Sequence, residues 1–223
     1  MWGAGILASS CAYRMGCGYV TWASHELPHE ELRTIPEVLT DRADNEKLWN
    51  EDQFTAVAVG PGLGVSDETS ALLKRLKLMD GVPVVVDADA ITTAVQKNLF
   101  PFPENWVLTP HSGELSRILK ISASEIEQDR FSATLQAAEI TGCHVLLKGY
   151  RSVIGYQGRC MVINAGNSAL AKAGTGDVLT GMVGSLMAQG LDTLQATATA
   201  AYIHGRLADE WVRSGHDKRS IVA

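Results

Sequence analysis

A glycine-rich turn that leads into a helix is the part of this sequence best suited to chemistry. The segment Asn164 to Gly190 contains Gly174, Thr175 and Gly176, followed at once by Asp177. Glycines let the backbone approach a ligand closely, and the first N–H groups of a helix have no partners within the helix. With the helix dipole, these N–H groups form a site for an anion such as a transferring phosphoryl group. A carboxylate beside that anion can accept a proton from an attacking hydroxyl.

The competing interpretation is an ordinary helix start, with Asp177 as a cap and the glycines only turning the chain. Two further glycines in the same helix, Gly181 and Gly184, argue against it because they thin the helix and let another element pack closely. The stretch from Asn164 to Lys172 is also small and polar, as the lining of a site would be. We therefore favour the phosphate site.

Four other loops carry polar or glycine residues directly after apolar, strand-like runs. These residues are Gly60, Gly62 and Gly64; Asp87 and Asp89; Thr109, His111 and Glu114; and Lys148 and Gly149. The three glycines do not form a dinucleotide turn or a Walker loop. A lysine after a strand can meet phosphate as a point charge. Because ligands of parallel sheets bind outside the carboxyl ends of the strands, we expect all these loops to share one rim.

The metal question stays open at this point. Asp87 is either a helix cap or a site carboxylate that acts directly or through magnesium-bound water. Glu114 is either a partner of a helix dipole or a more distant magnesium ligand. The sequence does not separate these alternatives, so the metal ligands are undetermined.

Short β-branched runs alternate with helical stretches along the chain, which predicts an α/β fold with a mostly parallel sheet and helices on both faces. An antiparallel hairpin at Gln157-Gly158 is expected at one edge. The predicted strands are Tyr19–Ala23, Ala56–Val59, Pro83–Val86, Trp106–Leu108, His144–Leu147, Val153–Tyr156 and Cys160–Ile163. The predicted helices are Gly5–Met15, Ser66–Met79, Ala90–Lys97, Gly113–Leu119, Ser124–Thr141 (with a capping box of Ser124 and Glu127), Gly176–Gln189 and Thr193–Arg213.

Composition bounds the class of protein. The 223 residues favour one domain spanning 1–223, and the net charge of −6 argues against binding the nucleic-acid backbone, which needs a basic patch. The four cysteines form no C-x-x-C pair and are expected to be reduced thiols. The apolar runs are strand-sized and no signal peptide is recognisable, so we expect a cytoplasmic protein without a membrane span.

Five motifs together resemble those of a known family. They are GPGLG, VVDADA, LTPHSGE, LLKG and NAGNSALAKAGTGDVLTGMVGSLMAQG. They are similar to motifs of the ribokinase-like superfamily, and more closely of the ADP- or ATP-dependent NAD(P)H-hydrate dehydratases, in the family's order and over nearly the whole chain. The resemblance implies a three-layer αβα fold and Mg²⁺-assisted use of ADP or ATP. It also implies repair of hydrated NADH or NADPH by phosphorylation of the C6 hydroxyl and elimination of phosphate.

The resemblance also implies roles for particular residues. Asp177 would be the catalytic base and would contact the hydrate. The anion hole would be Gly174, Thr175 and Gly176. The hydrated nicotinamide would meet Ala4, Gly60, Gly62, Gly64 and His111. The adenine nucleotide would meet Lys148, Gly149, Tyr150, Arg151, Ser152, Asn164, Asn167 and Gly176. A homo-oligomer is expected by analogy with relatives.

One departure from the family pattern is visible. Family members usually begin with a strand and a histidine-lysine-glycine segment, whereas this chain begins at Met1-Trp2-Gly3 with the family's first helix. The resemblance therefore predicts that the first strand is lacking here, which would affect catalytic competence.

Two alternatives to the dehydratase interpretation remain: a small-molecule kinase of the same fold, of the hydroxyethylthiazole kinase type, and a nucleotide-sensing module without turnover. The preference for ADP or ATP, and for either hydrate, is not readable from the sequence.

Overall fold

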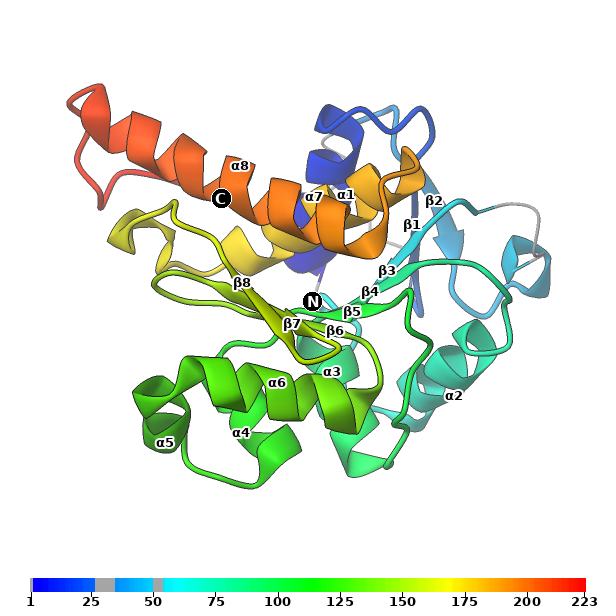
Figure 1. The fold of residues 1–223 in the computed structure, drawn as a ribbon. Helices are drawn as coiled ribbons and strands as arrows, with labels where there is room; N and C mark the ends of the chain where they lie inside the picture. The colour runs from blue at the N-terminus through cyan, green and yellow to red at the C-terminus, as the bar shows by residue number, and fades with distance from the viewer. Residues whose placement is uncertain (1, 27–34, 50–53) are drawn as a thin grey trace.

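Among the residues that the structure describes, six strands form the main sheet in the order β3-β4-β5-β6-β7-β8 (Figure 1). The computed structural model describes residues 2–26, 35–49 and 54–223. Strands β3 to β6 are parallel, and the β7–β8 hairpin adds two antiparallel strands at the edge, as predicted. The strands are β3 (Val57–Val59), β4 (Val84–Val86), β5 (Val107–Leu108), β6 (His144–Leu147), β7 (Val153–Tyr156) and β8 (Arg159–Val162).

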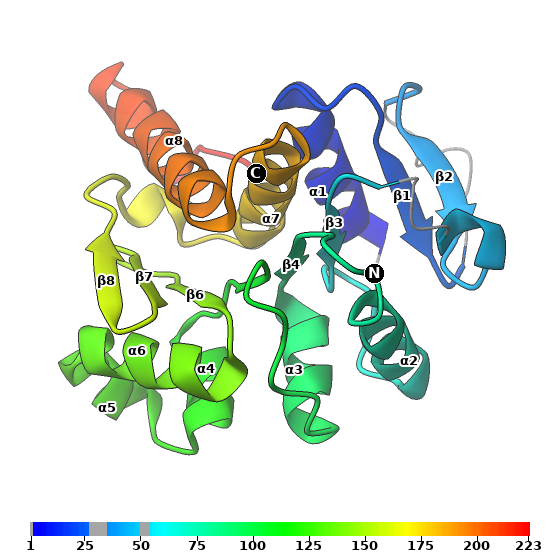
Figure 2. The same cartoon turned by 45° about the vertical axis from the view of Figure 1, so that its right-hand side comes forward.

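Helices cover both faces of this sheet (Figure 2). On one face α7 (Thr175–Ala188) and α8 (Thr193–Arg213) pack on the strands, and α1 (Trp2–Arg14) packs against α7. The other face carries α2 (Asp67–Leu76), α3 (Ala88–Gln96), α4 (Ser112–Leu119), α5 (Ala123–Gln128) and α6 (Arg130–Thr141). Alternate strand residues supply two separate cores: Val84 and Val86 face α2 to α6, whereas Val85 faces α7 and α8. The apolar runs in the sequence indicated this burial on both faces.

The single helix predicted over Ser124–Thr141 is wrong, because the chain forms α5 and α6 with a break between them. Asp129 sits at the break with φ −140° and ψ 78°, and its carboxylate accepts a hydrogen bond from the N–H of Ser132. An aspartate in this conformation starts a helix better than it continues one. The capping box is also displaced: Ser122 and Glu125 form it, not Ser124 and Glu127.

A second, two-stranded parallel sheet consists of β1 (Thr21–Ser24) and β2 (Leu39–Arg42). The sequence predicted β1, but β2 (Leu-Thr-Asp-Arg) has no apolar alternation and was missed. Among the described residues, β1 is paired with β2 and β3 with β4, and β1 and β3 are not paired with each other.

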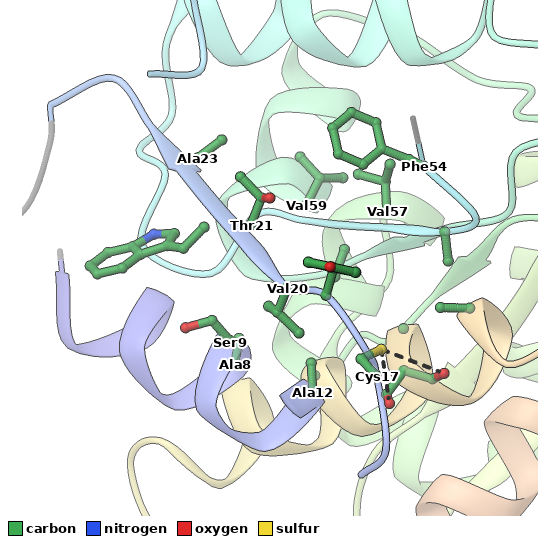
Figure 3. Close-up of a pocket in the computed structure, with 18 of the residues that line it drawn as sticks. Ala8, Ser9, Ala12, Cys17, Val20, Thr21, Ala23, Phe54, Val57 and Val59 are labelled. Carbon is green, nitrogen blue, oxygen red and sulfur yellow. Dashed lines mark hydrogen bonds between the residues drawn. The ribbon is translucent and has the colours of Figure 1, made fainter. Parts of the chain in front are cut away.

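A cavity of about 490 Å³ lies between β1, β3 and the helices α1 and α7. Figure 3 shows Val20, Thr21 and Ala23 on one side, and Val57 and Val59 on the other. Small residues of α1, namely Ala8, Ser9 and Ala12, line it from the helix side. The cavity touches the glycine turn at Gly60, but the lining residues do not include the start of α7.

Close packing of α1 on α7 depends on Gly181. A Cβ added there would lie 2.1 Å from the carbonyl oxygen of Ala8, so no larger residue fits without moving a backbone. Gly184 is less constrained, because a Cβ added there would lie 3.4 Å from the Cβ of Ala58 on β3, an ordinary contact distance. The prediction that a glycine lets another element pack closely on this helix is thus confirmed for Gly181 and α1. None of the helices in residues 2–26, 35–49 and 54–223 combines the length and apolar character that crossing a bilayer requires.

Candidate functional site

The start of α7 has the features of an anion site. Gly174 precedes the helix with φ 91°, and no side chain among the described residues caps the first turn. The Thr175 hydroxyl is engaged elsewhere, 2.8 Å from the carbonyl oxygens of Leu170 and Lys172. Thr175 can therefore offer a ligand only its backbone N–H. Gly174, Gly176 and Asp177 are half-buried, so the helix end remains accessible rather than covered by other parts of the protein.

Behind this turn lies a buried ion pair. The Lys148 ammonium is 2.8 Å from Oδ1 of Asp87, and the Thr180 hydroxyl donates to Oδ2 of Asp87 at 2.6 Å. Asp87 is 1% exposed. A Cβ added at Gly176 would lie 3.4 Å from Nζ of Lys148, so the ammonium sits directly beneath the first turn of α7. A cation and uncapped N–H groups at one point are the ingredients of a phosphate site.

The alternation of side chains along the strands explains why these groups converge. Val85, Val107 and Leu146 all belong to the core on the α7 side of the sheet. Because side chains two residues apart point to the same face, Asp87, Thr109 and Lys148 must also lie on that side, just beyond the strand ends. Thr109 is fully buried, and its hydroxyl has no hydrogen-bond partner among the described residues.

Asp177 is a partly buried carboxyl that lies near charges of both signs. Burial raises the pKa of its carboxyl, the charges of Asp87 and Asp89 raise it further, and Lys148 opposes them. A carboxylate with a raised pKa holds a proton more firmly, which suits a group that must accept one. Its position in the first turn of α7 puts this carboxyl next to the uncapped N–H groups.

The glycine turn after β3 is built around the same carboxylates. Gly60 has φ 124°, and a Cβ there would lie 1.8 Å from the carbonyl oxygen of Asp87, so the two loops touch through their backbones. The N–H of Gly64 donates to Oδ2 of Asp89 at 2.8 Å. Gly62 also has a positive φ, 67°. The structure therefore brings the turn Gly60 to Gly64 next to Asp87 and Asp89.

His111 starts α4 and is tied to that helix. Its Nδ1 accepts hydrogen bonds from the N–H groups of Gly113 and Glu114. The Glu114 carboxylate accepts from the N–H of His111 at 2.9 Å, which completes a capping box. The ring is still 58% exposed, so a ligand can reach its outer edge. Its loop adjoins the lysine loop, because the N–H of Lys148 donates to the carbonyl of Pro110 at 2.8 Å.

The segment after Lys148 forms an exposed loop. Gly149 has φ 146° and packs on Arg130, whose guanidinium donates to the carbonyls of Leu147 and Lys148. Tyr150 is 77% exposed with Arg151 over its ring, and the Ser152 hydroxyl donates to the carbonyl of Gly149.

The polypeptide returns beside this loop at Ile163, whose N–H donates to the carbonyl of Ser152 at 2.9 Å. Asn164 is exposed there. The Asn167 amide donates to Asp209, and its oxygen accepts from the N–H of Ala169, so Asn167 already makes two hydrogen bonds within the protein. Ala4 is half-buried on α1, and Leu7 of the same helix lies next to Gly174.

Both candidate magnesium carboxylates are engaged by protein groups: Asp87 by Lys148 and Thr180, and Glu114 by the α4 capping box. In the part of the chain that the structure describes, no three His, Cys, Asp or Glu side chains gather as a metal site would require. Mg²⁺ in nucleotide sites is commonly held by phosphates, water and one or two carboxylates. The donor set therefore fits a cation that arrives with a nucleotide rather than one held in a protein cage.

Comparison with known proteins assigns the chain. Residues 1–217 match the family model described as NAD(P)H-hydrate dehydratase. The chain belongs to this family. It is 37% identical over 218 residues to the ADP-dependent (S)-NAD(P)H-hydrate dehydratase of Neisseria meningitidis, covering 94% of this chain and 73% of that protein. It is 36% identical to the bifunctional NAD(P)H-hydrate repair enzyme of Salinibacter ruber, of which it spans 44%. The family resemblance inferred from the five motifs is confirmed.

Solved structures support this assignment of the chain to the dehydratase family. The ADP/ATP-dependent NAD(P)H-hydrate dehydratase of Bacillus subtilis, co-crystallised with ATP and Mg²⁺, superimposes with a TM-score of 0.84 at 29% identity, covering 99% of this chain and 82% of that one. The ribokinase-like α/β fold is thus confirmed. Hydroxyethylthiazole kinase from Pyrococcus horikoshii has a TM-score of 0.64 at 18% identity, a likeness of fold alone. The comparisons favour the dehydratase over the kinase alternative.

Sequence reasoning missed two polar residues at this site. Thr180 lies in the apolar run of α7 and gave no signal, although its hydroxyl is bound to Asp87. His204 lies on α8, where a lone histidine in a helix is usually unremarkable. Burial lowers the pKa of His204 from 6.5 to about 4, with a smaller contribution from the positive charge of Lys148.

The lowered pKa of His204 predicts that the free energy of unfolding depends on pH. Its folded-state pKa lies below the unfolded value, so the unfolded chain binds the extra proton first, and stability is lost as the pH falls from about 6.5 to about 4. The loss amounts to about 3 kcal/mol at pH 4. In urea unfolding, the free energy of unfolding of the His204→Gln variant should fall between about pH 6.5 and pH 4 by about 3 kcal/mol less than that of the unmodified protein. Equal pH dependence of stability in the variant and the unmodified protein would contradict the prediction.

Proposed function

We propose that this chain uses ADP or ATP to convert hydrated NADH or NADPH back to the reduced coenzyme. The observation that carries the proposal is the first turn of α7, where uncapped N–H groups, Lys148 and Asp177 meet at one accessible point. The names of the Neisseria and Bacillus relatives support the same substrate and nucleotide.

The reaction has two steps. Asp177 takes the proton of the C6 hydroxyl while that oxygen bonds to the terminal phosphorus of the nucleotide, and the bond from this phosphorus to the rest of the nucleotide breaks. The C6–O bond then breaks, the neighbouring carbon loses a proton, and phosphate leaves as the ring double bond is restored. Phosphorylation turns a poor leaving group into a good one, so positioning and charge stabilisation carry most of the catalysis.

The residues divide this work. The N–H groups of Gly174, Thr175 and Gly176 and the Lys148 ammonium hold the phosphoryl oxygens. We assign the turn Gly60 to Gly64, the exposed edge of His111 and the start of α1 at Ala4 to the hydrated nicotinamide. The loop Lys148–Ser152 and Asn164 border the nucleotide, and Asn167 supports that loop region through Asp209. Mg²⁺, when it arrives with the phosphates, would offset their charge.

The test is direct. Purified NADH hydrate and NADPH hydrate are each incubated with the protein, Mg²⁺ and either ADP or ATP, following the absorbance of the reduced coenzyme and the release of phosphate. Recovery of the coenzyme with stoichiometric phosphate supports the proposal, and a stable phosphorylated product would support a kinase. Failure with both nucleotides and both hydrates contradicts the dehydratase function for this chain.

A single domain over 1–223 and a homo-oligomer remain predictions, which limited proteolysis and light scattering can check.

A further inference from the structure

Asp87 follows β4 as the residue before α3, yet it does not cap that helix. Its backbone is extended, with φ −135° and ψ 164°, but its side chain makes no hydrogen bond to the first turn of α3. The carboxylate instead turns to the α7 side of the sheet, toward Lys148 and Thr180. An aspartate that gives up a favourable cap in order to bury its charge needs another reason to be there.

Stability alone is a weak reason. A buried ion pair often costs as much in desolvation as it gains in attraction, and apolar residues of similar size can replace it without loss. Here the pair joins the ends of β4 and β6 to the middle of α7, three segments distant in sequence. The Lys148 side chain is 19% exposed while that of Asp87 is 2% exposed. The cation therefore reaches the surface of the site, and the anion behind it does not.

We propose that Asp87 is a positioning residue: together with Thr180 it fixes the Lys148 ammonium beneath the first turn of α7, where that ammonium meets the transferring phosphoryl group. A lysine ammonium stands on a flexible four-carbon chain, so it holds one position only when a partner anchors it. Oδ1 of Asp87 anchors the ammonium, and the Thr180 hydroxyl orients the carboxylate by holding Oδ2. This inference rests on the proposed function and adds a residue that does not itself touch substrate.

The charge of Asp87 has a second effect. It raises the pKa of Asp177, as does Asp89 on α3, whereas Lys148 lowers it. Leu7 of α1 and Ala58 of β3 make apolar contacts with α7. The Cys17 thiol donates to the Ser185 hydroxyl of α7, and His204 on α8 is a further titratable group close to Lys148. Neutralising Asp87 should therefore lower the pKa of Asp177.

The first arm of the test uses Asp87→Asn, which keeps the shape and removes the charge. We expect kcat to fall by about tenfold or more, because a loosely held ammonium misplaces the phosphoryl group. The acid limb of the kcat/KM profile should move to lower pH by about half a unit or more. Binding of ATP·Mg²⁺, measured by calorimetry, should not weaken, since a negative charge has been removed. An unmoved limb together with weaker ATP binding would indicate a merely structural role and overturn the inference.

The second arm isolates the anchor without changing charge. Thr180→Val removes the hydroxyl from Asp87 and should lower kcat by about threefold to tenfold with no shift of the acid limb. Thr180→Ser should restore most of the activity. Thr197→Val is the matched control: Thr197 is also fully buried in a helix, but its hydroxyl donates only to the carbonyl of Thr193 in the same helix. Equal effects of the two valine variants would overturn the inference, and this arm remains decisive if Asp87→Asn does not fold.

The third arm is a double-mutant cycle of Asp87→Asn and Lys148→Met. If Asp87 acts through Lys148, kcat of the double variant should be within about threefold of kcat of Lys148→Met alone. If the two residues act independently, the factors by which the single variants lower kcat should multiply in the double variant. Calorimetry separates this inference from the proposed function, because Lys148→Met should weaken ATP·Mg²⁺ binding by about tenfold whether or not the hydrate turns over. Unchanged ATP·Mg²⁺ binding by Lys148→Met would show that Lys148 does not contact the phosphates, and would overturn the inference. ATP binding without any hydrate turnover in the unmodified protein would sink only the proposed function.

Discussion

Replacing Asp177 with asparagine is expected to lower kcat for the hydrate by a factor of about 10² to 10⁴, the usual contribution of a positioned general base. Asparagine keeps the size of the side chain but cannot accept the proton of the C6 hydroxyl. The substitution leaves the N–H groups at the start of α7 unchanged, and within the described part of the chain no side chain caps them. Binding of ATP·Mg²⁺ should therefore stay within a few-fold or improve, because a negative charge beside the phosphates is removed.

The measurement is steady-state turnover of NADH hydrate alongside calorimetric binding of ATP·Mg²⁺. Asp67→Asn provides a matched control, since Asp67 also lies in the first turn of a helix, α2, but is exposed and paired with Lys97. It should leave kcat unchanged. A variant at position 177 that retained a tenth or more of the activity would show that Asp177 is not the base. A nucleotide-sensing module without chemistry would show no effect on its nucleotide response.

Replacing Gly60 with alanine is expected to destabilise the protein by roughly 4 kcal/mol, since overpacking and backbone strain each cost about 1–3 kcal/mol. The added Cβ would lie 1.8 Å from the carbonyl oxygen of Asp87, which accepts the first hydrogen bond of α3 from Ala90. Neither partner is a flexible side chain, so a backbone has to move. Gly60 also has φ 124°, a conformation that alanine rarely adopts.

Gly64 in the same turn is the matched control. It also has a positive φ, 89°, but a Cβ there meets nothing within 4 Å, so alanine should cost only about 1 kcal/mol. Thermal unfolding distinguishes the two, with a fall of about 10 °C expected for Gly60→Ala and a few degrees for Gly64→Ala. Equal losses would mean that contact with the Asp87 backbone is unimportant. Because that contact positions Asp87, the Gly60 variant should also lose activity beyond its loss of folded protein.

Much of the architecture was readable from local patterns. The order of strands and helices, the edge hairpin and the glycine turn before α7 follow from apolar periodicity and from conformations that only glycine adopts easily. The same turn, with its neighbouring motifs, also indicated the family. The errors lie where the signal is weak or contested: β2 has polar residues on both sides, and Asp129 starts a new helix inside an otherwise continuous helical pattern.

The sequence by itself determined which side chains stand at the ends of the parallel strands, because each strand and its following loop are local. Only the tertiary structure decided what those side chains do. The sequence left Asp87 as either a helix cap or a site carboxylate acting directly or through magnesium-bound water. In the structure its side chain does not cap α3 and is the buried partner of Lys148 and Thr180. The physical reason is that the alignment of the strands, and the alternation of side chains between the two faces of the sheet, bring Asp87 next to Lys148 and Thr180. These residues are 61 and 93 positions away in the sequence. No local pattern encodes that alignment.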